Sequence, residues 1–208
     1  MVATAPKPTR THKLFKHLKV YLFGRPTNWS GTSQPLDPQT PLAQQVTEAA
    51  REAGATTVWL PRAGTFNARV CSQDEFTHGL LPRHYKLNGK ISLATGAVAD
   101  GIVLPAGHAF GIASGDCPTV IITDPKTDKT IPAHAGRDCL IDRQRVLNGE
   151  SSRGHDSVID AIIDAMVRPK PCHRVEIRRL QVLICGGIGS RFNTHPWQHP
   201  LWGEQNRR

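Results

Sequence analysis

Short hydrophobic runs separated by turn residues dominate the middle of the chain, and their spacing is typical of a β-sheet. Each run is rich in residues that favour strands, and the stretch DPKTDK (124–129) between two of them has the composition of a tight turn. One run before this region, at 56–60, and one run after it, at 175–185, have the same character. We therefore predict strands at TTVWL (56–60), DGIVL (100–104), AFGIAS (109–114), TVIITD (119–124), TIPAHA (130–135) and VEIRRLQVLIC (175–185).

Two stretches instead repeat their apolar residues at helical spacing. The first begins at Thr40, a suitable N-cap that is followed by Pro41 at the first helical position, and Gly54 supplies a stop. The second starts after Asp156, which we expect to be the N-cap, and ends before Pro169. Both stretches are amphipathic, so each predicted helix should cover one face of the sheet.

The remaining segments carry weaker patterns. Residues 61–98 are punctuated by Gly and Pro and are predicted to be irregular, and residues 137–154 are polar and loop-like. A chain of 208 residues is long enough for one domain with a proper core. We predict an α/β (α+β) fold, in which a mixed β-sheet with flanking helices forms a single domain over residues 39–208, after a basic arm and loop over residues 1–38.

The charge of the chain is strongly uneven. The formal net charge is +9, and no acidic residue occurs before Asp37. Residues 1–38 can therefore contact a nucleic acid or an anionic surface, or residues 1–25 can act as an organelle-targeting segment. The simpler interpretation is a solvated tail that runs into a strand at VYLF (20–23), because basic segments alone are weak evidence of a partner.

The cysteines and the hydropathy pattern bear on the compartment. The five cysteines form no CxxC pair, so the sequence favours neither a disulfide framework nor a structural zinc knuckle. No apolar run approaches the length of a transmembrane helix, and no secretory signal is evident. We expect a cytoplasmic protein with no transmembrane segment.

One cysteine and one histidine stand out for their chemistry. A hairpin around the turn at 124–129 brings Cys117 and His134 to the same edge of the sheet. A cysteine beside an imidazole can act as a nucleophilic thiolate, and the same pair can bind zinc. Asp116 can orient the histidine or a ligand. The alternative is a buried thiol and a core imidazole with no function.

The residues around this pair resemble a known family. ADGIV (99–103), GIASGDCPTVIITDP (111–125) and AHAG (133–136) follow the order of the family segments ADA-[LI]-V, TADCxPVLLxDP and AxHAGWRG. The similarity covers about residues 56–192, and the family is the YfiH-like laccase-domain (multicopper polyphenol oxidoreductase) family, now understood as purine nucleoside phosphorylases. The resemblance implies a purine nucleoside phosphorylase or adenosine deaminase-type enzyme, with a purine nucleoside as its small-molecule partner.

The resemblance also implies a metal and a set of site residues. The family site holds zinc, with copper named in its older description, between two histidines and a cysteine, and phosphate is the co-substrate. By position, Cys117 and His134 match two of these ligands, and an arginine of the family lies near the substrate. With our own assignments added, the expected residues are Cys117, His134 and Asp116 for catalysis, Arg137 and Gly136 for substrate binding, and Cys117, His134 and His78 for the metal.

The chain departs from the family pattern at two points near the expected site. LPRAGT (60–65) lacks the first histidine, and we prefer His78 to His84 and His108 as its substitute. The family tryptophan after Gly136 is missing, so Arg137 is displaced by one residue, and phosphate is a doubtful co-substrate.

Two further interpretations stay open. The family fold resembles the deamidase domain of cytotoxic necrotizing factor toxins, which use only a cysteine and a histidine, so a thiol-based amidohydrolase or deamidase is one alternative. A binding protein that keeps the fold but has an eroded site is the other. The histidines at 195 and 199 are each followed by a proline and are expected on a surface loop.

Overall fold

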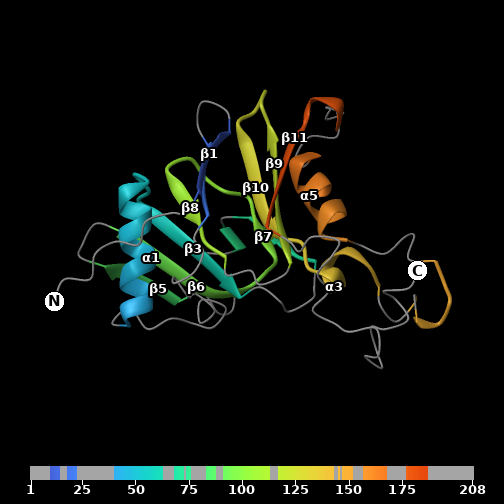
Figure 1. Cartoon of the computed structure of the whole chain (residues 1–208), viewed down its shortest axis with the longest axis horizontal. Helices are drawn as coiled ribbons and strands as arrows, with labels where there is room; N and C mark the ends of the chain where they lie inside the picture. Colours follow the sequence, from blue (N-terminus) through green and yellow to red (C-terminus); the bar gives the residue numbers. More distant parts are fainter. Residues whose placement is uncertain are drawn as a thin grey trace.

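The computed structural model describes helices packed on β-sheets (Figure 1). The described residues are 10–14, 18–22, 40–62, 68–72, 74–75, 83–87, 91–112, 117–142, 145, 147–151, 157–167 and 177–186. The strands are β1 (Arg10–Leu14), β2 (Leu18–Leu22), β3 (Thr57–Arg62), β4 (Val70–Cys71), β5 (Arg83–Leu87), β6 (Ile91–Val98), β7 (Gly101–Ile102), β8 (His108–Phe110), β9 (Pro118–Asp124), β10 (Lys129–His134) and β11 (Gln181–Gly186). The helices are α1 (Pro41–Glu52), α3 (Arg137–Leu140) and α5 (Val158–Val167), with a 3-10 turn, η2, at Ile177–Arg179.

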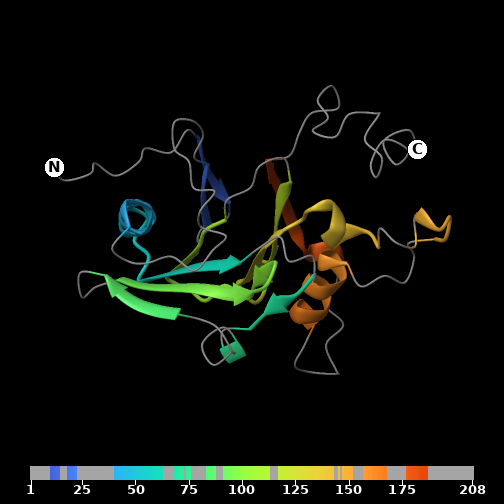
Figure 2. The ribbon, with the colours of Figure 1, turned by 90° about the horizontal axis from the view of Figure 1, so that it is seen from below.

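The strands form two larger sheets and one hairpin, so the predicted mixture of helices and sheet is confirmed at the level of an α+β fold. A five-stranded sheet has the order β11-β9-β10-β7-β4, and a four-stranded sheet has the order β5-β6-β3-β8. Each contains parallel and antiparallel pairs, whereas, among the described residues, β1 and β2 pair only with each other. In Figures 1 and 2, α1 lies against the four-stranded sheet and α5 lies beside the five-stranded sheet.

The first predicted helix is confirmed at both of its ends. Thr40 is the N-cap of α1, its hydroxyl accepts a hydrogen bond from the backbone N–H of Ala43 at 3.3 Å, and Pro41 opens the helix. Gly54 follows the last turn with a positive φ of 77°. The apolar face of α1 packs on β3 and β6, through the buried residues Ala43, Val46, Ala50, Val58, Leu60, Ile91 and Leu93.

The second predicted helix is also present, with a different capping residue. The backbone N–H of Asp160 donates to the Ser157 hydroxyl at 3.2 Å, and the backbone N–H of Ser157 donates to the Asp160 carboxylate at 3.1 Å. This reciprocal pair is a capping arrangement, so Ser157 satisfies the start of α5. The expected N-cap Asp156 lies outside the described residues. Below the helix, the core of the five-stranded sheet includes Val120, Ile122, Ile131, Ala133, Val158, Ile162 and Met166.

The predicted hairpin between β9 and β10 is confirmed in its register. The antiparallel pairs run from Lys129 opposite Asp124 to His134 opposite Thr119. The Asp124 carboxylate accepts a hydrogen bond from the backbone N–H of Lys126 at 3.0 Å, which closes the turn locally. Asp128 ends the turn with a φ of 54°, a conformation that Asp tolerates better than most residues. The turn chemistry therefore fixes which residues meet at the open end of the hairpin.

Three predictions about local structure were wrong in part. Residues 61–98 are not irregular throughout, because they contain β4, β5 and the eight-residue strand β6. The last strand begins at Gln181 rather than at 175, because residues 177–179 form η2. Within the polar stretch 137–154, α3 is a short helix. Strand preference depends on packing between neighbours, and β6 lies between β3 and β5.

The N-terminal arm is more ordered than a tail that leads into one strand at 20–23. Strands β1 and β2 pair in register from Arg10 opposite Leu22 to Leu14 opposite Leu18. In the part of the chain that the structure describes, no helix has both the length and the apolar character to cross a membrane.

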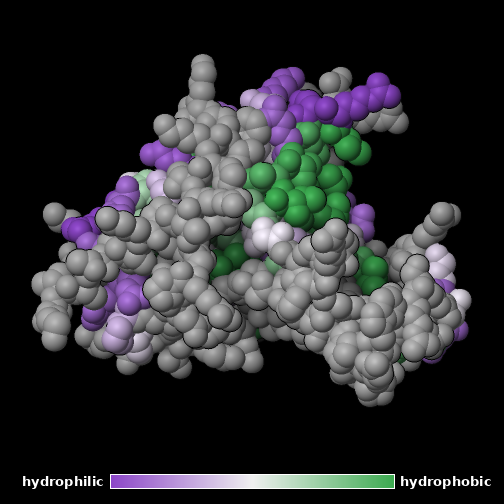
Figure 3. All heavy atoms as spheres, viewed as in Figure 1, coloured by the Kyte–Doolittle hydropathy of each residue, from purple (hydrophilic) through white to green (hydrophobic). Residues whose placement is uncertain are grey.

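Strand β11 forms one edge of the five-stranded sheet and carries an exposed apolar surface. Ile177, Val182 and Ile184 are more than half exposed. Val182 and Ile184 lie opposite Ile122 and Val120, which are core residues, so the hydrophobic face of the sheet continues to this edge. Figure 3 shows the hydrophobic residues gathered in the region where Figure 1 places β11 and α5.

Candidate active site

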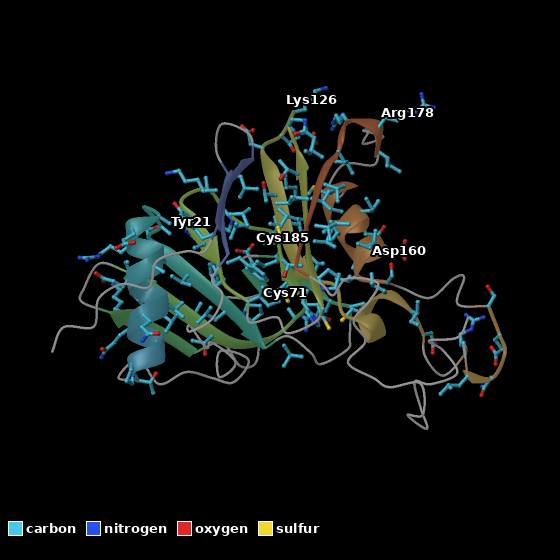
Figure 4. All side chains as sticks on the ribbon, in the orientation of Figure 1. Tyr21, Cys71, Lys126, Asp160, Arg178 and Cys185 are labelled. Carbon is cyan, nitrogen blue, oxygen red and sulfur yellow. The ribbon has the colours of Figure 1, made fainter. Side chains whose placement is uncertain are left out.

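A single row of residues crosses the five-stranded sheet at the end where β10 finishes. Cys185 lies opposite Thr119, and Thr119 lies opposite His134. On the other side of β10, the backbone N–H of His134 donates to the carbonyl oxygen of Asp100 at 2.7 Å. Figure 4 labels Cys185 on β11 and Cys71 on β4, the two edge strands of this sheet. The sheet register thus brings Asp100 and His134, which are far apart in sequence, to neighbouring positions.

The Nδ1 side of the His134 ring faces a buried carboxyl group and a buried thiol. Nδ1 lies 3.4 Å from Asp100 Oδ1 and 3.8 Å from Cys139 Sγ. Asp100 and Cys139 are fully buried, and His134 is 7% exposed. The second carboxylate oxygen, Asp100 Oδ2, is the one buried side-chain N or O atom without a hydrogen-bond partner among the described residues. Such an atom calls for an explanation, because burying an unsatisfied carboxylate oxygen is unfavourable.

The Nε2 side of the same ring faces Cys117 across Gly136. A Cβ atom added at Gly136 would lie 2.6 Å from His134 Cε1, 3.1 Å from Nε2 and 3.4 Å from Cys117 Sγ. Nε2 and Sγ therefore border the same point in space, and only a residue without a side chain leaves that point open. Cys117 is partly exposed, in contrast to the buried Cys139.

Cys139 reaches the ring from α3. Its backbone N–H donates to the Gly136 carbonyl at 3.0 Å, which starts the short helix directly after the HAG sequence. Burial raises the pKa of the Cys139 thiol to about 12, and the charge of Asp100 and a hydrogen bond to that carboxylate act in the same direction. At neutral pH, Cys139 is thus a protonated thiol beside Asp100 and His134.

The structure therefore identifies a group that can hold a metal ion. The ligand atoms of Asp100, His134 and Cys139 all lie within 4.8 Å of one another. A carboxylate, an imidazole and a thiol together are a donor set that suits zinc. Zinc thus fits these side chains, and Asp100 Oδ2 is a buried acceptor that a cation would satisfy.

The structure places only some of the expected site residues. It brings Cys117, His134 and Gly136 together, but among the described residues the metal-compatible group contains Asp100, His134 and Cys139 and not Cys117. Several of the expected residues lie outside the part of the chain that the structure describes, namely Asp116, His78, the histidines at 195 and 199, and the side chains of Arg137 and His84.

The other histidine considered as a ligand belongs to a different sheet. His108 opens β8, in the four-stranded sheet, and its Nδ1 accepts a hydrogen bond from Trp59 Nε1 at 2.8 Å. Burial lowers the pKa of His108, which favours the neutral imidazole that can accept this hydrogen bond. His108 therefore has a structural partner within its own sheet.

Sequence reasoning missed Asp100 and Cys139. Asp100 lies in the ADGIV segment that carries the family resemblance, but no role was assigned to it. Cys139 follows His134 by five residues, in a stretch that was predicted to be a loop. The available signal was a second cysteine directly after the HAG sequence.

Comparisons of the chain with family models, with curated proteins and with solved structures found no match. The resemblance to the YfiH-like family therefore stays a prediction.

Proposed function

We propose that the protein is a cysteine hydrolase that cleaves amide or related acyl bonds, with Cys117 as the nucleophile, His134 as the general base and acid, and Asp100 as the residue that orients His134. The observation that carries this proposal is the position of the His134 ring between two groups. Nδ1 faces the Asp100 carboxyl group at 3.4 Å, and Nε2 faces the space beside Cys117 Sγ. This order of carboxyl group, imidazole and nucleophile is the arrangement that nucleophilic hydrolysis requires.

The chemistry follows from these positions. Asp100 accepts a hydrogen bond from the Nδ1–H group, and this tautomer leaves Nε2 without a hydrogen and able to take the proton of the Cys117 thiol. The sulfur attacks the substrate carbonyl carbon and forms a carbon–sulfur bond. His134 then returns the proton to the leaving nitrogen as the carbon–nitrogen bond breaks, and a thioester remains. Water attacks the thioester, gives its proton to Nε2, and releases a carboxylic acid and the free thiol.

The distance of 3.4 Å between Nδ1 and Asp100 Oδ1 is long for a strong hydrogen bond. Catalytic hydrogen bonds are often long in proteins without substrate and shorten when substrate binds. The backbone contact at 2.7 Å between the same two residues holds them in register meanwhile.

The other described cysteines are less suited to this role. Burial raises the pKa of the Cys71, Cys185 and Cys139 thiols, so a smaller fraction of each is ionised at neutral pH. All three are buried, whereas Cys117 is partly exposed. A substrate therefore reaches the Cys117 sulfur more readily than the sulfurs of the other three.

The experiment is to measure the acylation of Cys117 by p-nitrophenyl acetate and its alkylation by iodoacetamide, with the modified residue located by mass spectrometry. We expect Cys117 to be modified first, and its rate to fall at least about tenfold in His134→Gln, because the base is lost. Asp100→Asn should lower the rate less and change its pH dependence, and Cys185→Ala is the matched control. Equal rates at Cys117 in the wild type and His134→Gln would refute the proposal.

A second candidate function is the one implied by the family resemblance, namely reaction at a purine nucleoside. The metal-compatible group of Asp100, His134 and Cys139 favours it, because a bound zinc ion supplies a Lewis acid that activates water. Adenosine and inosine, assayed with and without phosphate, decide between the two candidates. Nucleoside conversion that persists in Cys117→Ala supports this second function, and conversion that rises with phosphate restores the phosphorylase assignment.

A further inference from the structure

The two sides of the His134 ring face different chemistry, and the structure points to a use for the second side. We infer that Asp100, His134 Nδ1 and Cys139 Sγ form a zinc site that is separate from Cys117, and that zinc bound there switches Cys117 off. The metal site stands on the geometry of its three ligands alone. Its effect on Cys117 rests on the proposed function.

The two separations from His134 Nδ1 are close to those of a tetrahedral zinc site, and all three donor atoms lie within 4.8 Å of one another. Zinc bonds of about 2.0 Å to nitrogen or oxygen and about 2.3 Å to sulfur place neighbouring ligand atoms about 3.3 to 3.6 Å apart. Nδ1 lies 3.4 Å from Asp100 Oδ1 and 3.8 Å from Cys139 Sγ, so small shifts of the side chains suffice.

The burial of the group supports a closed site. Asp100 and Cys139 are fully buried, and His134 is nearly so. The unpartnered Asp100 Oδ2 offers a cation a further oxygen from within the site. Zinc bound by these three buried side chains would hold His134 in one orientation.

Zinc binding and thiol activation need opposite forms of the same imidazole. A neutral imidazole that binds zinc through Nδ1 carries its proton on Nε2. Nε2 then has no lone pair with which to accept the proton of Cys117, and Asp100 no longer orients an Nδ1–H group. The metal-bound form is thus inactive in thiol chemistry, and removal of the metal restores the base.

The ligand set makes a sharp distinction between the two cysteines. Cys139 lies on the Nδ1 side of the ring, whereas Cys117 borders the Nε2 side. Loss of Cys139 should remove the metal, and loss of Cys117 should not. The set expected from the family resemblance predicts the reverse, because it contains Cys117.

Cobalt(II) is the probe for the metal site, because a thiolate ligand gives cobalt a charge-transfer band in the near ultraviolet. We expect the full chain to show this band and to lose it when zinc is added. The band should persist in Cys117→Ala and in the control Cys185→Ala. In Cys139→Ser, zinc affinity should fall by more than about 100-fold, since changes outside the ligand shell already cost about 10- to 100-fold.

Three outcomes would overturn the metal site. The first is a wild-type chain without the cobalt band, and the second is a band that disappears in Cys117→Ala. The third is a Cys139→Ser chain that keeps the band. If Cys139→Ser fails to fold, the band in Cys117→Ala still decides, because it then requires a thiolate other than Cys117.

The switch is tested by the rate at which iodoacetamide alkylates Cys117. Zinc should lower this rate at least tenfold in the wild type and leave it unchanged in Cys139→Ser. Zinc that binds without slowing alkylation overturns the switch and leaves the metal site standing. If the alkylation rate of Cys117 is low without metal and is unaffected by His134→Gln, the proposed hydrolase is refuted instead. Failure of the switch and failure of the proposed function are therefore distinguishable.

Discussion

The ion pair between Asp124 and Arg179 stabilises the far end of the β9–β10 hairpin, and its contribution can be worked out from the structure. Arg179 Nε and its terminal nitrogen donate to the two carboxylate oxygens at 2.8 Å each. The backbone N–H of Lys126 and the hydroxyl of Thr127 donate to the same carboxylate at 3.0 Å. Figure 4 shows Lys126 and Arg178, the neighbours of this ion pair, at one end of the molecule.

The size of this contribution to stability follows from the pKa of the Asp124 carboxyl group. Arg179 is the main reason that the pKa of Asp124 falls from 3.8 to about 2, and the two further hydrogen bonds add to it. Asp124 is 2% exposed, so solvent screens the pair little. Each pKa unit corresponds to about 1.4 kcal/mol, so the ion pair and the two further hydrogen bonds together contribute about 2 kcal/mol to the free energy of unfolding at neutral pH.

The perturbation is Asp124→Asn, which keeps the shape of the side chain and removes its charge. The lowered pKa means that the stabilisation is fully present above pH 3.8 and is lost as the pH falls towards 2. The variant should therefore be less stable than the wild type by about 2 kcal/mol at pH 7 and by about 1 kcal/mol near pH 3. Urea unfolding followed by circular dichroism measures both differences.

The matched control is Asp128→Asn in the same turn. Asp128 is exposed and has a φ of 54°, which asparagine also tolerates, so the substitution should change stability by less than about 0.5 kcal/mol. A double substitution with Arg179→Met isolates the coupling between the two side chains. The reasoning is wrong if Asp124→Asn loses the same free energy at pH 3 as at pH 7, or if Asp128→Asn is equally destabilising.

Three further predictions concern the site and the core. Gly136→Ala should displace His134, because the new Cβ would lie 2.6 Å from its ring. Alkylation of Cys117 should then slow at least about tenfold, and an unchanged rate would contradict this packing. Ser157→Ala should lower the free energy of unfolding by about 1 kcal/mol, measured in urea, through loss of the helix cap. Thr123→Val should lower the free energy of unfolding by about 1 to 3 kcal/mol, because it leaves the buried hydroxyl of Thr130 without its partner at 3.0 Å. Thermal unfolding should show that the double variant with Thr130→Val recovers most of this loss.

The sequence by itself determined the elements whose signals are local. The N-cap and first proline of α1 and the turn after Asp124 act over a few residues, so their positions could be predicted. The hairpin turn also fixed the register of β9 and β10, and with it the approach of Cys117 to the end of β10. That part of the candidate site was accessible from the chain alone.

The tertiary structure alone decided the other half of the site. Asp100 meets His134 because β7 pairs with β10, across more than thirty residues of chain, and no local pattern specifies that pairing. Strand β6 was not predicted for a related reason, because its conformation depends on pairing with β5 and β3 on its two sides. Which ring nitrogen of His134 lies near the Asp100 carboxyl group, and which lies near Cys117, depends on contacts between distant segments. Spacing along the chain carries no information about those contacts until the sheet is assembled.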